Sequence, residues 1–198
     1  MEDLENYRKE NLTIDIVWAN LFGFLLIAPI VFVYGIPFYF IWHHHYPVDR
    51  LGEYMDRIGV AGLGGGFGLF LLLLMGGIIA HELIHGIAWS FFTKRGFRSI
   101  RFGVMWKMIT PYCHCKEPLK VKHYVLGAIM PGLLLGVLPG VVALGTGSLT
   151  LMLFAIFFTM AAAGDFLMVH LLRKESRESW VQDHPSEMGC YIFRKEED

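Results

Sequence analysis

Four long stretches of this sequence are almost free of charged residues. They cover residues 16–42, 67–92, 125–144 and 149–172, and each has the length of about 20 residues with which an apolar helix spans a bilayer. We therefore predict an all-α polytopic membrane protein with about four transmembrane helices. In this prediction residues 1–172 form a single transmembrane domain, and residues 173–198 form a cytoplasmic tail.

Two glycine-containing segments adjoin these stretches. Gly62, Gly64 and Gly65 lie in a glycine run before the second stretch. Because glycine is a poor helix former, we expect a loop or re-entrant segment over residues 59–68 and a helix that begins near residue 67. Residues 145–148 read Gly-Thr-Gly-Ser and separate the third and fourth stretches by a short turn. This spacing predicts an antiparallel pair of helices.

The segment between the second and third stretches, residues 93–123, is basic. It holds eight lysine and arginine residues and a single acidic residue, Glu117. Since such residues concentrate on the cytoplasmic side of a membrane, we expect a multi-pass protein of the cell membrane with both termini in the cytoplasm. The patterns of residues 98–104 and 113–115 favour short strands, which predicts a small cytoplasmic β-hairpin. Residues 189–193 are a further candidate strand, which would pair with this middle segment or with an extended substrate. Residues 113–115 read Cys-His-Cys and are spaced too tightly to enclose a metal alone.

Composition agrees with a membrane protein. Hydrophobic residues make up 55% of the chain and charged residues 18%, whereas a soluble domain carries about 25% charged residues. The net charge of −1 gives no indication of nucleic-acid binding, so the lipid bilayer is the partner that composition predicts. The first residues are acidic and lack the basic start of a signal peptide, and three cysteines are too few for a disulfide framework.

The second apolar stretch contains three ionisable residues at an informative spacing. His81, Glu82 and His85 form an H-E-x-x-H motif. Residues four apart lie one above the other on a helix, so the two imidazoles can reach the same zinc ion. Glu82 flanks them, where a carboxylate can act as general base on a water molecule. Ionisable residues inside membrane helices are rare and usually functional, which favours a zinc site.

Such a zinc site needs one more protein ligand. Asp165 is the only acidic residue of the last two apolar stretches. Both Asp165 and His85 lie about eight residues before the basic end of the apolar stretch that contains them. At 1.5 Å per helical residue, both lie about 12 Å below the same surface. We therefore predict Asp165 as the third ligand. A partner for a buried polar group and a proton relay are its alternative roles, and His170 is the second candidate ligand.

An H-E-x-x-H motif on one apolar stretch and an aspartate two stretches later resemble the site-2 protease class of intramembrane zinc metalloproteases. More narrowly, the chain is similar to small bacterial membrane proteins of the DUF3267 type, which are grouped as zincin peptidases. The resemblance runs from about the second apolar stretch to the tail. It implies that His81, His85 and Asp165 bind Zn²⁺ and that Glu82 is the catalytic base. Site-2 proteases typically carry Leu-Asp-Gly around the aspartate, whereas this chain reads Gly-Asp-Phe.

Together these features predict a zinc metalloendopeptidase that hydrolyses peptide bonds of a membrane protein or a membrane-associated peptide. Two other classes stay open. One is a non-catalytic membrane protein with a structural or regulatory metal site, and the other is a metal-transport component that uses histidine and aspartate as transit ligands. Glu82 discriminates between them and a protease, because neither needs a base beside its ligands.

Overall fold

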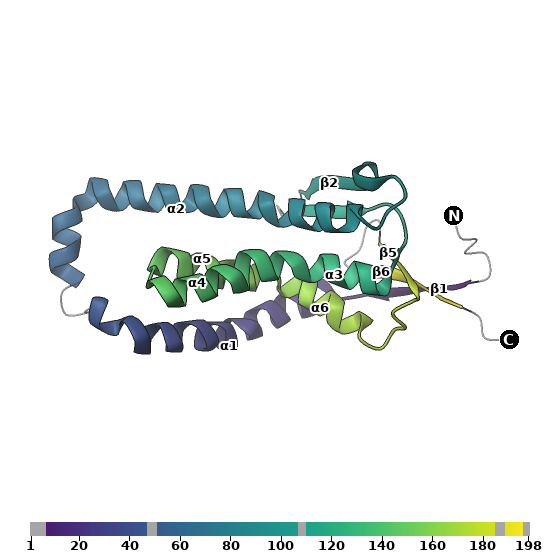
Figure 1. The fold of residues 1–198 in the computed structure, drawn as a ribbon, viewed down its shortest axis with the longest axis horizontal. Coiled ribbons are helices and arrows are strands. Elements are labelled where there is room, and N and C mark those ends of the chain that lie inside the picture. Colours follow the sequence, from purple (N-terminus) through teal and green to yellow (C-terminus); the bar gives the residue numbers. More distant parts are fainter. Residues whose placement is uncertain (1–6, 47–50, 107–109, 185–188, 196–198) are drawn as a thin grey trace.

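The computed structural model describes residues 7–46, 51–106, 110–184 and 189–195 (Figure 1). Long helices lie side by side along the long axis, and the strands gather at the end that holds both chain termini. Three helices are long and apolar enough to cross a membrane, and a bent pair of helices makes a fourth candidate. We predicted an all-α chain with about four transmembrane helices, and the described residues show a mostly helical chain with three to four candidate spans.

The first candidate span is α1 (Ile16–Trp42), followed by the short helix η2 (His43–His45). Asp15 caps its start, because its carboxylate accepts hydrogen bonds from the main-chain N–H groups of Val17 and Trp18. At the other end, the indole of Trp42 donates a 2.8 Å hydrogen bond to the carbonyl of Leu144. This bond ties α1 to the end of the third span.

The second candidate span, α2 (Leu51–Ser90), differs from the prediction. We expected a loop or re-entrant segment over residues 59–68. The structure breaks the helix only at the first of these residues, Gly59, with φ 67° and ψ 172°, and continues it through the rest. A Cβ on Gly64, Gly65 or Gly66 would meet no atom within 4 Å, so no close contact requires these glycines. In apolar surroundings an opened backbone finds no water to bond with, and this favours an unbroken helix.

The third candidate span begins earlier than predicted, at Val121. It consists of α3 (Val121–Pro131), a π-helical segment η5 (Gly132–Val137) and α4 (Leu138–Thr146). The fourth consists of α5 (Leu149–Ala161) and α6 (Ala163–Leu172), which are bent by 41°. Thus the fourth predicted helix is broken near its middle, while its pairing with the third span agrees with the expected turn.

Strands form two small sheets. After the short helix η4 (Gly96–Ser99), β2 (Ile100–Met105) pairs antiparallel with β3 (Thr110–Cys115), which confirms the hairpin. The second sheet has the order β1-β6-β5-β4 and was not part of the all-α prediction, although β6 includes the candidate strand at residues 189–193. Its strands come from both ends of the chain and from the middle segment: β1 (Tyr7–Thr13), β4 (Leu119–Lys120), β5 (Trp180–Asp183) and β6 (Gly189–Lys195). The division at residue 172 stays a prediction.

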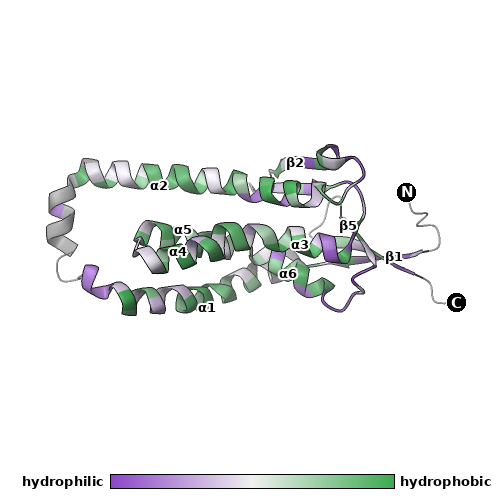
Figure 2. Ribbon diagram, in the orientation of Figure 1, coloured by the Kyte–Doolittle hydropathy of each residue, from purple (hydrophilic) through white to green (hydrophobic). Residues whose placement is uncertain are grey.

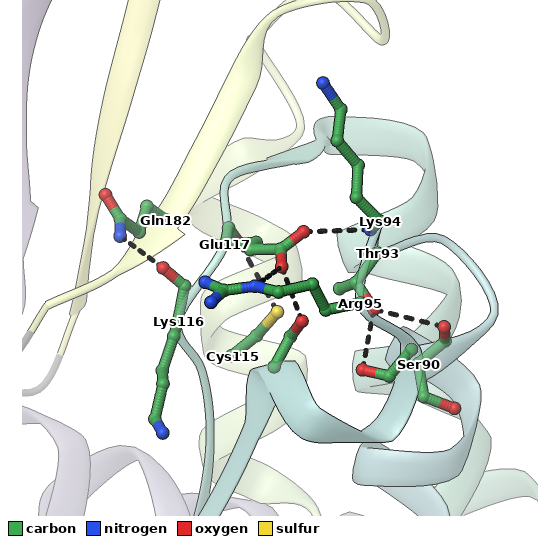
Figure 3. A network of polar contacts seen from close by, with 10 residues as sticks. Ser90, Thr93, Lys94, Arg95, Cys115, Lys116, Glu117 and Gln182 are labelled. Atoms are coloured by element: carbon green, nitrogen blue, oxygen red, sulfur yellow. Dashed lines mark hydrogen bonds and ion pairs between the residues drawn. The ribbon is translucent and has the colours of Figure 1, made fainter. Parts of the chain in front are cut away.

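Hydrophilic residues concentrate at the end with the sheets, while apolar residues cover the helices (Figure 2). Glu117 organises the connection after α2 (Figure 3). Its carboxylate accepts hydrogen bonds from the Ser99 hydroxyl, the main-chain N–H of Lys94 and the Arg95 guanidinium, at 2.6, 2.8 and 3.0 Å. The Ser99 bond contributes most to lowering the pKa of Glu117 to about 2. These bonds fix the hairpin relative to the end of α2.

Candidate metal centre

The last third of α2 carries the H-E-x-x-H motif. His81 and His85 lie on the same face of this helix, with ring centroids 5.0 Å apart, and both are buried. The segment is apolar and contains no proline, so nothing interrupts the helical ladder that sets this spacing. The helix therefore presents two imidazoles toward one point, as their four-residue separation predicts.

Asp165 meets both imidazoles from the first turn of α6. Its Oδ2 lies 3.2 Å from Nε2 of His81, and its Oδ1 lies 3.2 Å from Nε2 of His85. Potential ligand atoms of the three residues all lie within 4.8 Å of one another. Two residues that are 80 positions apart in sequence, His85 and Asp165, thus lie at the same depth, as the counting from the helix ends predicted.

The separations suit zinc. Zn²⁺ binds imidazole nitrogen and carboxylate oxygen at about 2.0–2.2 Å, which places two tetrahedral ligand atoms roughly 3.3–3.5 Å apart. The 3.2 Å between each Nε2 and its carboxylate oxygen is close to that value. The three residues therefore bring together donors of the types and separations that a zinc site requires.

The hydrogen bonds of His85 are those of a protonated imidazole or of a neutral imidazole that binds a metal ion. Nδ1 of His85 lies 3.0 Å from the carbonyl of Gly127, while its Nε2 faces the carboxylate of Asp165. A neutral imidazole has one N–H only, so it cannot donate to two acceptors. A metal ion bound by Nε2 and the carboxylate removes this conflict and leaves the Nδ1 proton to Gly127. Among the described residues, Nδ1 of His81 is a buried polar atom without a partner.

Glu82 is half-buried and lies outside this ligand set. The main chain of Cys113 in β3 is within hydrogen-bonding reach of its carboxylate. The hairpin comes this close because Gly86 has no side chain: a Cβ there would lie 2.6 Å from the ring of Phe102 and 3.0 Å from Ile100. The fold thus places a carboxylate beside the three candidate ligands and under the hairpin.

Sequence reasoning missed the residues that surround His85. Its ring stacks on Trp89 with centroids 5.0 Å apart, and Trp89 stacks on Tyr124 at 5.1 Å. Gly127 makes room for this stack, because a Cβ there would lie 2.2 Å from Nε1 of Trp89. The position of Trp89, four residues after His85 on the same face, was the one signal that the sequence offered.

The other candidate ligands lie elsewhere. His170 is exposed, and its Nδ1 lies 3.2 Å from the guanidinium of Arg173. Burial raises the pKa of Cys115 to about 12, which keeps it a thiol. Within the described part of the chain, the one group of three possible ligands is His81, His85 and Asp165.

The sequence model of the DUF3267 family, described as "Putative zincin peptidase", matches residues 74–180, more than half of the chain. The chain belongs to this family. The matched segment includes the three candidate ligands and Glu82, whereas α1, β1 and β6 lie outside it. A zincin binds a metal, in agreement with the donor set found here. No curated protein and no solved structure matches the chain.

Proposed function

We propose that this DUF3267 protein is a zinc-dependent metalloprotease of the site-2 protease type, which hydrolyses peptide bonds of a membrane-associated substrate within or beside the bilayer. One observation carries this proposal. Glu82 lies directly beside the His81, His85 and Asp165 cluster without belonging to it. All four residues lie on helices or helix pairs that are apolar and long enough to cross a membrane.

In this proposal His81, His85 and Asp165 hold the metal, and Glu82 transfers protons. Zinc, when bound, polarises the scissile carbonyl and makes a water molecule more acidic. The Glu82 carboxylate takes a proton from the attacking water as the new C–O bond forms, and returns it to the leaving nitrogen as the C–N bond breaks. Both imidazoles are buried, while Glu82 is only half-buried and stays accessible to the water molecule that reacts.

The number of ligands favours catalysis over a structural metal. A structural zinc site is closed by four protein ligands, whereas a catalytic one has three and keeps a position for water. The described residues supply three. A transit site of a transporter has no use for a base, yet Glu82 is placed beside the ligands and within reach of the Cys113 main chain. Both observations support the protease.

We further propose that the end with the sheets faces the cytoplasm of the cell. The described residues nearest to both termini pair with each other in β1 and β6, so both chain ends lie on one side of the helices (Figure 1). The basic middle segment, residues 93–123, reaches the same end. A concentration of lysine and arginine is typical of the cytoplasmic side.

This orientation predicts the labelling of single cysteines. Arg98→Cys, at the end with the sheets, should react with a membrane-impermeant reagent only when the cytoplasmic side is accessible. Asp56→Cys, before the break of α2, should react from the outside. Both positions are exposed, and the unsubstituted protein gives the background of its three native cysteines. The opposite pattern would refute the orientation but would leave the site unchanged.

Removal of the metal tests the proposed function directly. The purified protein, reconstituted with a panel of single-span membrane peptides, should lose cleavage when a strong zinc chelator removes its metal and regain it when zinc is returned. The fragments are identified by mass spectrometry, and a calcium-selective chelator is the control. Cleavage that persists at full rate in protein shown to be zinc-free would contradict a metalloprotease.

A further inference from the structure

A series of side-chain contacts runs from the candidate metal centre to the four-stranded sheet β1-β6-β5-β4, which we call the terminal sheet. His85 stacks on Trp89 with an interplanar angle of 17°, and Trp89 stacks on Tyr124 with an angle of 18°. The hydroxyl of Tyr124 donates a 2.6 Å hydrogen bond to Oδ1 of Asp183 at the end of β5. Consecutive side chains therefore connect a candidate ligand with a strand that lies close to the end of the chain.

Asp183 is the point where three elements meet. While Oδ1 accepts from Tyr124 in α3, Oδ2 accepts a 2.8 Å hydrogen bond from the main-chain N–H of Cys115 in β3. Only 11% of its side chain is exposed, and this burial raises its pKa. A buried carboxylate is costly unless its oxygens are hydrogen-bonded, so both bonds are needed to keep Asp183 in this place.

Trp89 has little freedom to move within the stack. Its Nε1 donates a 3.0 Å hydrogen bond to the carbonyl of Tyr124, and Gly127 packs directly against its indole. Trp89 and Tyr124 are both at least 95% buried. A rotation of the Tyr124 ring would therefore be passed on to Trp89 and to the face of the His85 imidazole.

We propose that Asp183 is a positioning residue of the metal centre, which fixes the plane of the His85 imidazole through Tyr124 and Trp89. This inference rests on the proposed function, since it assigns His85 as a ligand. Gly127 fixes His85 by a hydrogen bond at Nδ1, and the stack fixes the tilt of its ring. Asp183 lies beyond the segment that matches the family, so the terminal sheet supplies part of the support of the site.

The affinity for zinc tests this role. It is measured on the purified full chain by competition with a chromophoric chelator, for Asp183→Ala, Tyr124→Phe and the double variant. Tyr124→Phe keeps the stacked ring and removes only the hydroxyl. We expect each single variant to bind zinc about 10-fold more weakly, the lower end of the effect of lost partners around metal ligands. The double variant should bind zinc no more weakly than either single variant, because both substitutions break the same hydrogen bond between Tyr124 and Asp183.

Val181→Ala is the matched control. Val181 is fully buried on the same strand and belongs to the core of the sheet, so its truncation should lower the thermal midpoint and leave the affinity for zinc unchanged. If Asp183→Ala does not fold, Tyr124→Phe still tests the link. Parental affinity in Tyr124→Phe, an additive loss in the double variant, or an equal loss in Val181→Ala would each overturn the proposal.

Because the affinity is measured without a substrate, the outcome does not depend on cleavage. A protein that shows this coupling but cleaves nothing would refute the protease and leave the positioning role intact. If the protein cleaves peptides in the presence of zinc and Tyr124→Phe keeps the parental affinity for zinc, the protease proposal stands and the positioning role is refuted. The two proposals are therefore tested separately.

Discussion

The Glu82→Gln protein should keep the zinc content of the parent and lose nearly all cleavage. Glutamine has almost the size of glutamate but cannot accept the proton of the attacking water, and a general base typically contributes about 10²–10⁴ in rate. We expect kcat to fall by a factor in this range. Glu82 is not among the three candidate ligands, so the metal should stay. Elemental analysis and single-turnover cleavage on the same preparation measure both quantities.

Glu178→Gln is a suitable control for this experiment. Glu178 is an exposed carboxylate that pairs with Lys120 and Lys122 at the end with the sheets. Its neutralisation should leave the rate at the parental value. A Glu82→Gln protein that retains its zinc and cleaves at a rate close to the parent would rule out Glu82 as the base. Loss of zinc in Glu82→Gln would instead make Glu82 a ligand and would also contradict the assignment.

The helices and the ligand cluster were predictable because both depend on short-range spacing. Apolar stretches long enough to span a bilayer identify helices directly. The four-residue spacing of His81 and His85 fixes their relative position on any helix. Asp165 could be found because membrane helices are nearly parallel, so a residue count from the basic end measures depth. For these reasons the cluster agrees with the sequence, although its atoms come from two distant segments.

The breaks in the helices were less predictable. The glycine run suggested a loop over residues 59–68, but helix α2 breaks only at the first of these residues, Gly59, where φ is positive. The fourth helix breaks at Ala162, with φ −76° and ψ 4°, although no proline or glycine run marks that position. Ala162 is fully buried and packs against Gly132 of the third span. A Cβ on this glycine would lie only 3.2 Å from the Cβ of Ala162. Packing between distant segments, which a residue count does not reveal, sets this break.

The sequence indicated a strand over residues 189–193 but not its neighbours in the terminal sheet, for a similar reason. Strand β1 pairs with β6, so that Tyr7 lies opposite Lys195 at the other end of the chain. Asp183 has no local pattern around it that distinguishes a buried carboxylate from the exposed acidic residues of the tail. Its role depends on Tyr124 and Cys115, which approach it only in the folded chain.

The ligand role of Asp165 makes the second large prediction. In Asp165→Asn the carboxylate becomes a neutral amide, which is a poor zinc ligand. The affinity for zinc should fall by more than about 100-fold, since loss of a partner outside the ligand set already costs 10- to 100-fold. Cleavage should be abolished. Asp165→His should recover part of the zinc, because imidazole is also a good ligand, although its longer reach should keep cleavage low.

His170→Ala is the matched control, since His170 lies on the same helix, is exposed and contacts Arg173. It should bind zinc as the parent does, whereas a ligand role for His170 would require a loss. If Asp165 acted as a proton relay, or only oriented His81 and His85, Asp165→Asn and Asp165→His would both keep stoichiometric zinc, with a loss of affinity of no more than about 10- to 100-fold. Zinc per protein at equal thermal midpoints separates these cases. Full zinc occupancy of Asp165→Asn in the presence of a competing chelator would refute the ligand assignment, because a site that has lost one of its three protein ligands should not hold zinc against a chelator.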